Sequence, residues 1–462
     1  MSLIIPANTL ASGGYAVDNS CRFNSGSSDA LIKTLADPGG AGNRNKWTFS
    51  TWIKRSKLGT NQWIFGSYQS SAYYTSINFE TNDTLNFFDY YNSSVNGKRN
   101  TNRVFRDTSA WYHIVCIWDK DNGTSSQKMR IYVNGTEETS FATSSAPSNA
   151  TTLNADGQDI SIGQKEGVGS YIDGYLAETV FNDGQAYTAD NYGEFDSDSG
   201  IFKPIDGLAD LTFGTSGFYL DFKDSANLGN DVNGGTDLTE NNLTAIDQTT
   251  DTPTNNFATF NPLINNWTSI SEGNLKVTNS TQAYRDVFST FAVSQGKWYV
   301  ECRIDVESGG TYPIFGIADA GDYSYPAQHN LIGTSANGYG FYTDGNYFNN
   351  GSDIGNWSTL ANGDVIGFYL DLDSGTKTLK VYKNGSSEVS VNINNPIDGY
   401  YFGCSTFQAD GASGSINFGN PTYALTSAVA DANGYGSFEY NPTIGGVNYL
   451  SLCTANLSEV LG

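Results

Sequence analysis

The sequence predicts an all-β protein with two antiparallel β-sandwiches joined by a long polar connector. Apolar and polar residues alternate along short runs such as WTFSTWIKR (47–55) and MRIYVNG (129–135), and turn residues separate the runs. The 462 residues include 51 Gly, only 11 Pro and 14% aromatics, a composition typical of ordered, turn-rich β structure. No segment of a dozen residues shows a capped helical stripe, so little helix is expected.

Two distant stretches repeat one hairpin pattern. Residues 118–135 and 369–385 each contain an apolar strand, an Asp-rich turn, an alternating strand and an Asn-Gly pair. Asn-Gly is the pair best able to supply the two positive φ angles of a type I′ turn. We therefore predict the same antiparallel hairpin twice, once in each sandwich.

The domain boundaries follow from composition. The first sandwich is predicted over residues 1–225 and the second over 263–420, and the tail 421–462 is expected to pack on one of them. Segment 226–262 is dense in Asn, Asp, Thr and Gly, which favours a mostly irregular connector. The apolar residues that would let it drape over a domain surface are Leu238, Leu243, Ile246 and Phe257.

Charge excludes several classes of partner. The chain has 48 acidic and 24 basic residues, a net charge of −24. It gains nothing from counterion release on nucleic acid, and an anionic membrane surface repels it. No apolar run is long enough for a membrane span. We expect no nucleic-acid partner and no membrane insertion.

The cysteines and the N-terminus give the expected location. Five cysteines without a pairing pattern argue against a disulfide-stapled secreted protein. The opening MSLIIPANTL has no cationic region and contains Pro6, so it is not a secretory signal. A virion protein, which lysis releases, satisfies both observations.

The first module resembles a known family. WTFSTWIKR (47–55), AWYHIVCIWD (110–119), MRIYVNG (129–135) and YIDGYLAETVFNDGQAYT (171–188) occur in the order found in laminin-G-like, concanavalin-A-like domains. The resemblance covers roughly 180 residues and implies a two-sheet jelly roll.

The second module resembles a different family, the SPRY domains, which are also jelly rolls. The resemblance covers roughly 125 residues. The motifs that carry it, in order, are GKWYVECRID (296–305), IFGIAD (314–319), NGYGFYTDG (337–345), GDVIGFYLDLD (363–373), LKVYKNG (379–385) and SINFG (415–419).

Two further segments, 6–23 and 217–257, look like parts of structural proteins of marine bacteriophages. This resemblance implies a place on the virion surface. The partners it implies are other virion proteins, further copies of the chain in a homo-oligomer, and a glycan on the host cell surface.

A catalytic site is not expected. Glu301, Asp305 and Glu307 resemble the acidic triplet of family-sixteen-type β-glucanases, but the position of that pattern's first Glu holds Arg303. Retaining hydrolysis needs two carboxylates about 5–5.5 Å apart. His113 lies within a predicted strand, where a structural histidine is the default.

Calcium is the one cofactor that the sequence suggests. Asp119, Asp121 and Asn122 miss the EF-hand spacing and are interpreted as a solvated hairpin tip. Laminin-G-like domains often hold calcium at a sandwich rim, so another acidic group is the leading candidate for a calcium site. The alternative is that these residues only form part of a polar connector. This group is Asp221, Asp224, Asn227 and Asp231.

Aromatic residues in loops and at strand ends are the candidate ligand-binding residues. Sugars bind on flat aromatic faces beside Asn or Asp, although such aromatics often only pack at a sandwich rim. The candidates are Tyr73 and Tyr74 in the first module and Tyr323, Tyr325, Tyr342, Tyr347 and Trp357 in the second.

The sequence therefore predicts a non-enzymatic phage surface protein, a tail-fibre or receptor-binding subunit that attaches to host glycan. A capsid decoration or head-fibre protein is the alternative, because no coiled-coil shaft is present. A glycan-degrading enzyme is the lesser alternative.

Overall fold

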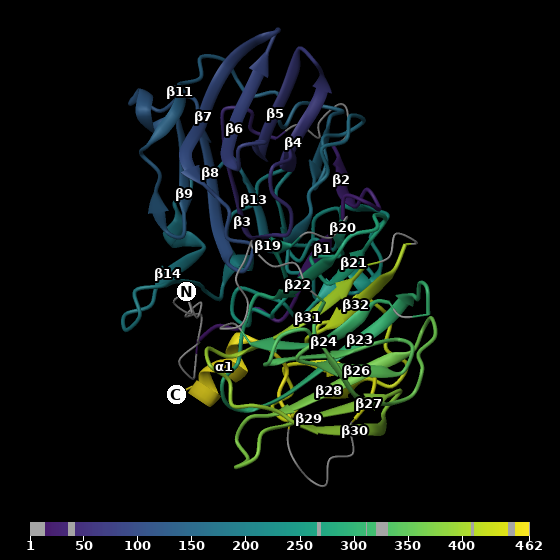
Figure 1. The fold of residues 1–462 in the computed structure, drawn as a ribbon. Coiled ribbons are helices and arrows are strands. Elements are labelled where there is room, and N and C mark those ends of the chain that lie inside the picture. The colour runs from purple at the N-terminus through teal and green to yellow at the C-terminus, as the bar shows by residue number, and fades with distance from the viewer. Residues whose placement is uncertain are drawn as a thin grey trace. The chain divides into compact units, whose positions relative to one another are not determined.

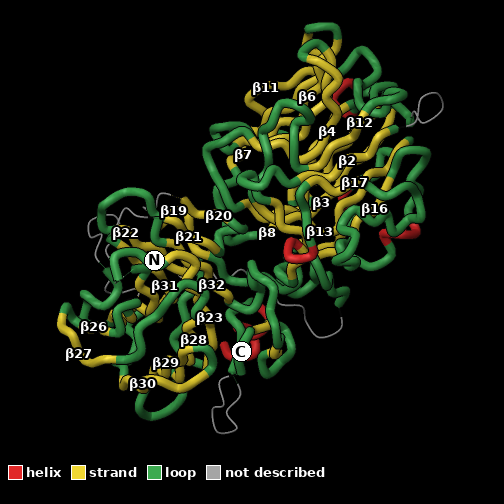
Figure 2. The backbone as a smooth tube through the Cα atoms, turned by 90° about the vertical axis from the view of Figure 1, so that its right-hand side faces the viewer, coloured by secondary structure: helices red, strands yellow, loops and turns green. Residues whose placement is uncertain are grey.

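The chain folds into two all-β units. The computed structural model describes residues 14–35, 42–265, 269–310, 312–319, 331–407, 411–441 and 449–461. The compact units are Leu10–Thr254 and a second that contains Asn255–Gly462 (Figure 1). Antiparallel strands dominate both units, so the predicted all-β jelly-roll class is confirmed (Figure 2).

The first unit consists of two sheets. Sheet A has the strand order β10-β9-β8-β3-β13-β1-β18, with β16 also paired to β13. Its strands are β1 (Ser20–Phe23), β3 (Lys46–Arg55), β8 (Trp111–Asp119), β9 (Met129–Val133), β10 (Thr136–Glu137), β13 (Gly174–Asp183), β16 (Phe218–Leu220) and β18 (Gln248–Thr249).

Sheet B has the order β11-β7-β6-β5-β4-β12-β2-β17. Its strands are β2 (Ala30–Thr34), β4 (Gln62–Ser70), β5 (Tyr73–Phe79), β6 (Thr84–Tyr91), β7 (Ser94–Val104), β11 (Phe141–Ser145), β12 (Asp159–Ile162) and β17 (Thr239–Asn241).

Aromatic side chains fill the space between sheets A and B. Trp47 and Trp118 are direct cross-strand partners in sheet A, and their parallel rings have centroids 6.2 Å apart. Phe49 of sheet A stacks on Phe65 of sheet B with centroids 4.2 Å apart. Since all four are buried, they join the two sheets into one core.

The outward face of sheet A is covered by a second apolar cluster. Residues 184–217 cross this face and contain β14 (Gly193–Phe195), β15 (Phe202–Pro204) and the short 3₁₀ helices Ala189–Asn191 and Leu208–Asp210. The cluster joins sheet A residues to this segment. Its buried members include Trp52, Val115, Ile117, Tyr175, Tyr192, Phe202, Leu208 and Phe213.

The segment interpreted as a connector is largely part of the first unit. Its residues up to Thr254 supply β17, the 3₁₀ helix Ala245–Asp247 and β18. β17 pairs with β2 of sheet B, and β18 pairs with β1 of sheet A. Leu238 and Leu243 lie in the core. The first unit therefore extends beyond the predicted boundary at 225, because a few apolar anchors and paired strands suffice to dock a polar segment.

The second unit is also a two-sheet sandwich. Sheet C has the order β19-β22-β31-β24-β25-β26-β27. Its strands are β19 (Phe260–Asn265), β22 (Arg285–Ser289), β24 (Ile314–Asp319), β25 (Gly338–Phe341), β26 (Asn346–Asn349), β27 (Ser352–Asn356) and β31 (Tyr400–Thr406).

Sheet D has the order β20-β21-β32-β23-β28-β29-β30. Its strands are β20 (Ser269–Ser271), β21 (Lys276–Thr278), β23 (Lys297–Val306), β28 (Val365–Asp371), β29 (Thr378–Lys383), β30 (Ser386–Asn392) and β32 (Ser413–Asn417).

The two predicted Asn-Gly turns have the geometry that the sequence requires. Asn134 and Gly135 have φ of 47° and 77° and connect β9 to β10. Asn384 and Gly385 have φ of 47° and 78° and connect β29 to β30. Both residues of each pair are left-handed, as a type I′ turn demands, so the repeated hairpin is confirmed.

The C-terminal tail packs on the outward face of sheet D. It contains β33 (Val429–Ala430), β34 (Ser437–Phe438) and the helix α1 (Thr454–Leu461). Phe438 and Tyr449 contact Tyr299 with ring centroids 5.0 and 5.1 Å apart. The backbone N–H groups of Glu439 and Tyr440 each donate to the Glu301 carboxyl at 2.8 Å. Glu301 therefore holds the tail.

Candidate functional site

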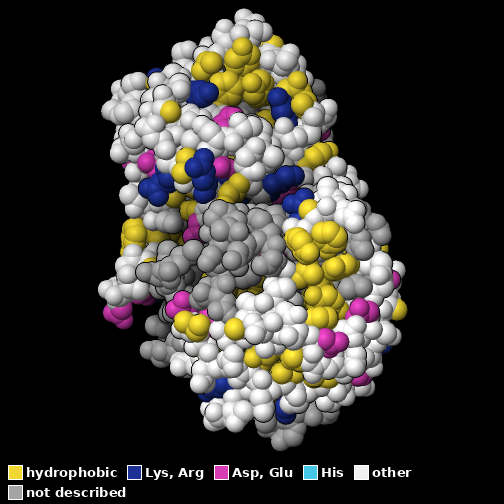
Figure 3. Space-filling view, viewed as in Figure 1, with side chains coloured by type: hydrophobic (Ala, Val, Ile, Leu, Met, Phe, Trp, Pro, Cys, Tyr) yellow, Lys and Arg dark blue, Asp and Glu magenta, His cyan; other side chains and the backbone are white. Residues whose placement is uncertain are grey.

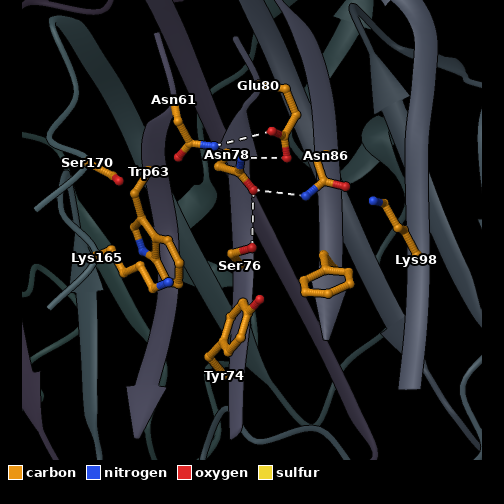
Figure 4. A pocket seen from close by; sticks show the side chains of 11 residues that line it. Asn61, Trp63, Tyr74, Ser76, Asn78, Glu80, Asn86, Lys98, Lys165 and Ser170 are labelled. Carbon is orange, nitrogen blue, oxygen red and sulfur yellow. Dashed lines mark hydrogen bonds between the residues drawn. The ribbon is translucent and has the colours of Figure 1, made fainter. Parts of the chain in front are cut away.

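The outward face of sheet B carries a polar pocket of about 370 Å³ (Figure 4). Alternation along β5 produces it: Ile77 and Phe79 point into the core, while Tyr74, Ser76 and Asn78 point outward. The lining residues come mainly from β4 to β7. They are Asn61, Trp63, Tyr74, Ser76, Asn78, Glu80, Asn86, Phe88, Lys98, Lys165 and Ser170.

Strand register arranges the lining side chains in rows across the sheet. Trp63, Asn78 and Asn86 are cross-strand partners on β4, β5 and β6. In the next row Ser76 lies opposite Phe88, and Phe88 lies opposite Lys98. These rows place an amide, an indole, an aromatic ring and a cation on one face.

The third row is aromatic. Tyr68, Tyr74 and Tyr90 are cross-strand partners, and Tyr74 lies 5.8 Å from Tyr68 and 5.4 Å from Tyr90 between ring centroids. Phe88 lies 5.5 Å from Tyr74. These four rings form an aromatic platform beside the pocket, and Figure 3 shows hydrophobic side chains flanked by basic ones where β4 to β7 lie in Figure 1.

Hydrogen bonds hold the floor of the pocket. Asn78 accepts from the Ser76 hydroxyl at 3.1 Å and from the Asn86 amide at 3.0 Å, and its own amide donates to Glu80 at 3.2 Å (Figure 4). The Asn61 amide donates to the other Glu80 oxygen at 3.3 Å. The network fixes the orientation of these side chains before any ligand arrives.

Two buried polar atoms of the pocket have no hydrogen-bond partner. They are Nε1 of Trp63 and Oδ1 of Asn86, and the two residues are only 2% and 4% exposed. Gly66 admits the indole, since a Cβ there would lie 2.5 Å from the Trp63 ring. A buried donor or acceptor without a partner costs about 1–3 kcal/mol, so both atoms gain from a polar ligand.

Two lysines flank the pocket. Nζ of Lys165 lies 4.5 and 4.7 Å from the Tyr68 and Tyr74 rings, and Nζ of Lys98 lies 5.3 Å from the Phe88 ring. Lys165 lies in a tight loop, in which its backbone N–H donates to the Gly169 carbonyl. Burial lowers the pKa of Lys165. Such cation–π contacts contribute about 0.5–1 kcal/mol at exposed sites.

The structure brings one predicted aromatic, Tyr74, into this pocket. Tyr73 lies outside the lining, packs edge-on against Tyr91 at 5.4 Å and donates its hydroxyl to Asn92 at 3.3 Å. Sequence reasoning missed the other lining residues. The alternation of polar residues along β5 was visible, but cross-strand register was needed to join them to Trp63.

The predicted aromatics of the second unit pack at its rim. Tyr347 stacks on Phe341 with centroids 5.2 Å apart, and Trp357 meets the same ring edge-on at 5.6 Å. The Trp357 indole N–H donates to the Tyr342 carbonyl at 3.2 Å. Tyr323 and Tyr325 lie outside the described residues. Ligand binding by this group stays a prediction.

The acidic group predicted to bind calcium is engaged in turns. Asp221 and Asp224 accept backbone N–H groups two residues further on, and the Asn227 amide donates to Asp237 at 2.8 Å. Asp231 is buried and forms an ion pair with Lys33 at 3.6 Å. Among the described residues no group of three or more His, Cys, Asp or Glu is arranged to hold a metal ion.

Other titratable groups considered in the sequence serve the fold. His113 is buried, burial lowers its pKa to about 3, and a ring nitrogen hydrogen-bonds to Ser50 at 2.9 Å. Asp305 forms ion pairs with Arg303 at 2.6 Å and Lys276 at 3.7 Å. In the described ranges, no helix has the length and apolar character needed to cross a membrane.

Comparison with known proteins agrees with the first set of motifs. Residues 26–190 match the family model described as the concanavalin A-like lectin/glucanases superfamily. This stretch is therefore a domain similar to the laminin-G-like, concanavalin A-like family. The resemblance predicted from the sequence is confirmed here, and the pocket lies within this domain. A search of curated proteins gave no match in sequence.

Three solved structures illustrate what the fold is similar to. The SPRY domain of human HERC1 is 18% identical, with 34% of this chain and 96% of that chain covered and a TM-score of 0.30. A SAP-like pentraxin from Limulus polyphemus is 20% identical, with 37% and 78% covered and a TM-score of 0.28. A putative carbohydrate binding protein from Bacteroides ovatus is 16% identical, with 49% and 59% covered and a TM-score of 0.34.

Proposed function

We propose that the protein binds carbohydrate in the pocket on sheet B and serves as a non-enzymatic attachment protein on a bacteriophage particle. In this role it recognises a glycan on the host cell surface. The observation that carries the proposal is the pocket itself, which joins unpartnered buried polar atoms to an aromatic platform.

The chemistry of the pocket suits a sugar. A sugar ring presents hydroxyl groups at its edge and C–H groups on its faces. The hydroxyls can accept from Nε1 of Trp63 and donate to Oδ1 of Asn86, the two atoms without partners. The C–H faces can lie on Tyr74 or Phe88, which line the same pocket.

The number of carboxyl groups in the pocket favours binding without catalysis. Glu80 is the one carboxyl-bearing residue among the described residues that line the pocket, and both its oxygens accept from amides. Glycoside hydrolysis generally uses a pair of carboxyl groups on either side of the bond.

The virion location is supported by the resemblance of segments 6–23 and 217–257 to phage structural proteins and by the net charge of −24. Immunogold labelling of intact particles tests it. We expect label at the tail tip. Label spread evenly over the head would contradict the fibre role and favour the capsid decoration protein instead.

A glycan screen with the purified chain tests binding, followed by titration of the best ligand. Tyr74→Ala removes one ring of the platform and should weaken affinity about tenfold, since stacking on a ring contributes about 1 kcal/mol or more. Tyr347→Ala, in the second unit, is the matched control and should bind normally. Loss confined to Tyr347→Ala would instead place the site in the second unit.

A further inference from the structure

We propose that the recognised sugar carries an acidic group, a carboxylate or a sulfate, which Lys98 and Lys165 bind at the two sides of the pocket. This inference rests on the proposed function, because it names the class of ligand for the same site. The observation behind it is that two lysines line one pocket without an acidic partner (Figure 4).

These two lysines differ from the cations buried on the other sheet of the sandwich, which form ion pairs. Acidic residues outnumber basic ones two to one, 48 to 24, so a carboxylate is readily found for most cations. On the opposite sheet Lys54 pairs with Asp251 at 2.6 Å, and Arg55 pairs with Asp83 at 3.2 Å. Within the described part of the chain, neither Lys98 nor Lys165 lies in such a pair, and their ammonium groups lie over aromatic rings.

The pocket's own carboxylate does not neutralise them. Glu80 lies among the lining residues but accepts from the amides of Asn61 and Asn78, and it forms no ion pair with either lysine. Two ammonium groups therefore remain available for an anion. Charge-assisted hydrogen bonds from an ammonium to a carboxylate or sulfate are roughly twice as strong as neutral ones.

The position of the lysines fits one sugar ring lying on the platform. Lys165 lies over Tyr74 on β5, and Lys98 lies over Phe88 on the neighbouring strand β6. Adjacent strands are about 4.8 Å apart, so the two rings are neighbours and the cations approach them from opposite sides. A ring stacked on Tyr74 and Phe88 therefore brings its substituents toward both ammonium groups.

Burial strengthens the preference for an anion. Lys165 is half-buried and burial lowers its pKa, which means that its ammonium has lost part of its hydration. Figure 4 shows its chain beside the Trp63 indole. An anion that draws the Lys165 side chain outward stabilises its ammonium charge in place of the lost water. The same movement gives a ligand access to the unpartnered Nε1 of Trp63.

The test is calorimetric titration of the full chain with three oligosaccharides of equal length: a polyuronate, a sulfated galactan and a neutral galactan. We expect an acidic probe to bind at least about tenfold more tightly than the neutral one. The polyuronate and the sulfated galactan separate a carboxylate from a sulfate as the recognised group.

Variants assign the effect to the two lysines. Lys98→Gln and Lys165→Gln remove the charge and keep a polar side chain that is one atom shorter. Each should lower the affinity for the acidic probe about tenfold more than it lowers the affinity for the neutral probe. Lys128→Gln, in the same unit but outside the pocket, is the control.

The failures of the two proposals are distinguishable. Equal binding of neutral and acidic probes, weakened by Tyr74→Ala but not by the lysine variants, overturns this inference and leaves the proposed function standing. If none of the three probes binds and the glycan screen is also empty, both are overturned.

Discussion

The two outward faces of the first sandwich differ in whether their lysines have carboxylate partners. On sheet A, a covering segment of the same chain buries the face, and its cation Lys54 is paired with Asp251. On sheet B, the face around the pocket has no such cover among the described residues, and Lys98 and Lys165 are without carboxylate partners. On the covered face the cation has a carboxylate partner within the protein. On the open face the two lysines remain available to a ligand.

Covered faces in both units each contain a buried glutamate that accepts hydrogen bonds from residues distant in the sequence. In the first unit, Glu178 accepts from the hydroxyls of Tyr219 at 2.6 Å and Tyr15 at 3.3 Å. In the second, Glu301 accepts from the backbone of the tail. The pocket carboxylate, Glu80, differs because it only organises neighbouring amides.

The largest effect on stability is predicted for a substitution that breaks the ion pair on the covered face. Asp251 accepts from Lys54 at 2.6 Å and from the Trp111 indole at 3.1 Å, and it is fully buried. Asp251→Ala removes the carboxylate of a buried ion pair and should lower the free energy of unfolding of the first unit by about 3–5 kcal/mol. Scanning calorimetry measures this, with the exposed Asp121→Ala as control. A loss below about 1 kcal/mol would contradict the importance of the pair.

The second prediction concerns pH. Burial raises the pKa of Glu178 to about 7, above its value of 4.5 in an unfolded chain. The folded state therefore binds the proton more tightly, and the resulting stabilisation is present below pH 4.5 and lost as pH rises through about 7. The change is on the order of 3 kcal/mol over this window. We expect Tm of the first unit to fall between pH 4.5 and 7.

Glu178→Gln checks the origin of that pH dependence. It removes the titrating group, so the fall in Tm over this window should flatten in the first unit. The second unit should keep its own dependence, because burial raises the pKa of Glu301 to about 7 as well. An unchanged profile in the first unit would assign the pH dependence to other groups.

The fold could be predicted from the sequence because its signals are local. Alternation and Asn-Gly pairs specify hairpins within a few residues, as the φ angles of Asn134 and Gly135 show. The docked segment before Thr254 was harder to predict, since its strands β17 and β18 are short and polar and pair with β2 and β1 at the start of the chain.

The site was harder still, because cross-strand register creates it. Tyr74 was predicted as an exposed aromatic, but Trp63 looked like an ordinary strand residue. Lys165 comes from a loop far along the chain, and the pairing of β12 with β4 brings that loop to the pocket. A sequence pattern shows which residues face outward; it does not show which outward residues are neighbours.

A smaller effect is expected when the unpartnered donor is removed from the open face. Trp63→Phe keeps an aromatic ring and deletes Nε1, which has no acceptor in the protein. The free energy of unfolding should change by less than about 1 kcal/mol, since the lost packing and the removed desolvation cost oppose each other. Affinity for the glycan should nevertheless fall. Strong destabilisation would indicate that Nε1 has a partner within the folded protein.

The smallest effect on stability is predicted for the two lysines of the open face. The double variant Lys98→Gln/Lys165→Gln breaks no ion pair and removes only cation–π contacts at the surface, so unfolding should change by no more than about 1 kcal/mol. Lys54→Gln makes the same chemical change on the covered face, where it leaves Asp251 buried without its cation, and should cost several times more. Calorimetry of the two variants side by side measures the difference directly. Equal losses would mean that the lysines of the pocket support the fold, and the contrast between a satisfied face and a binding face would be wrong.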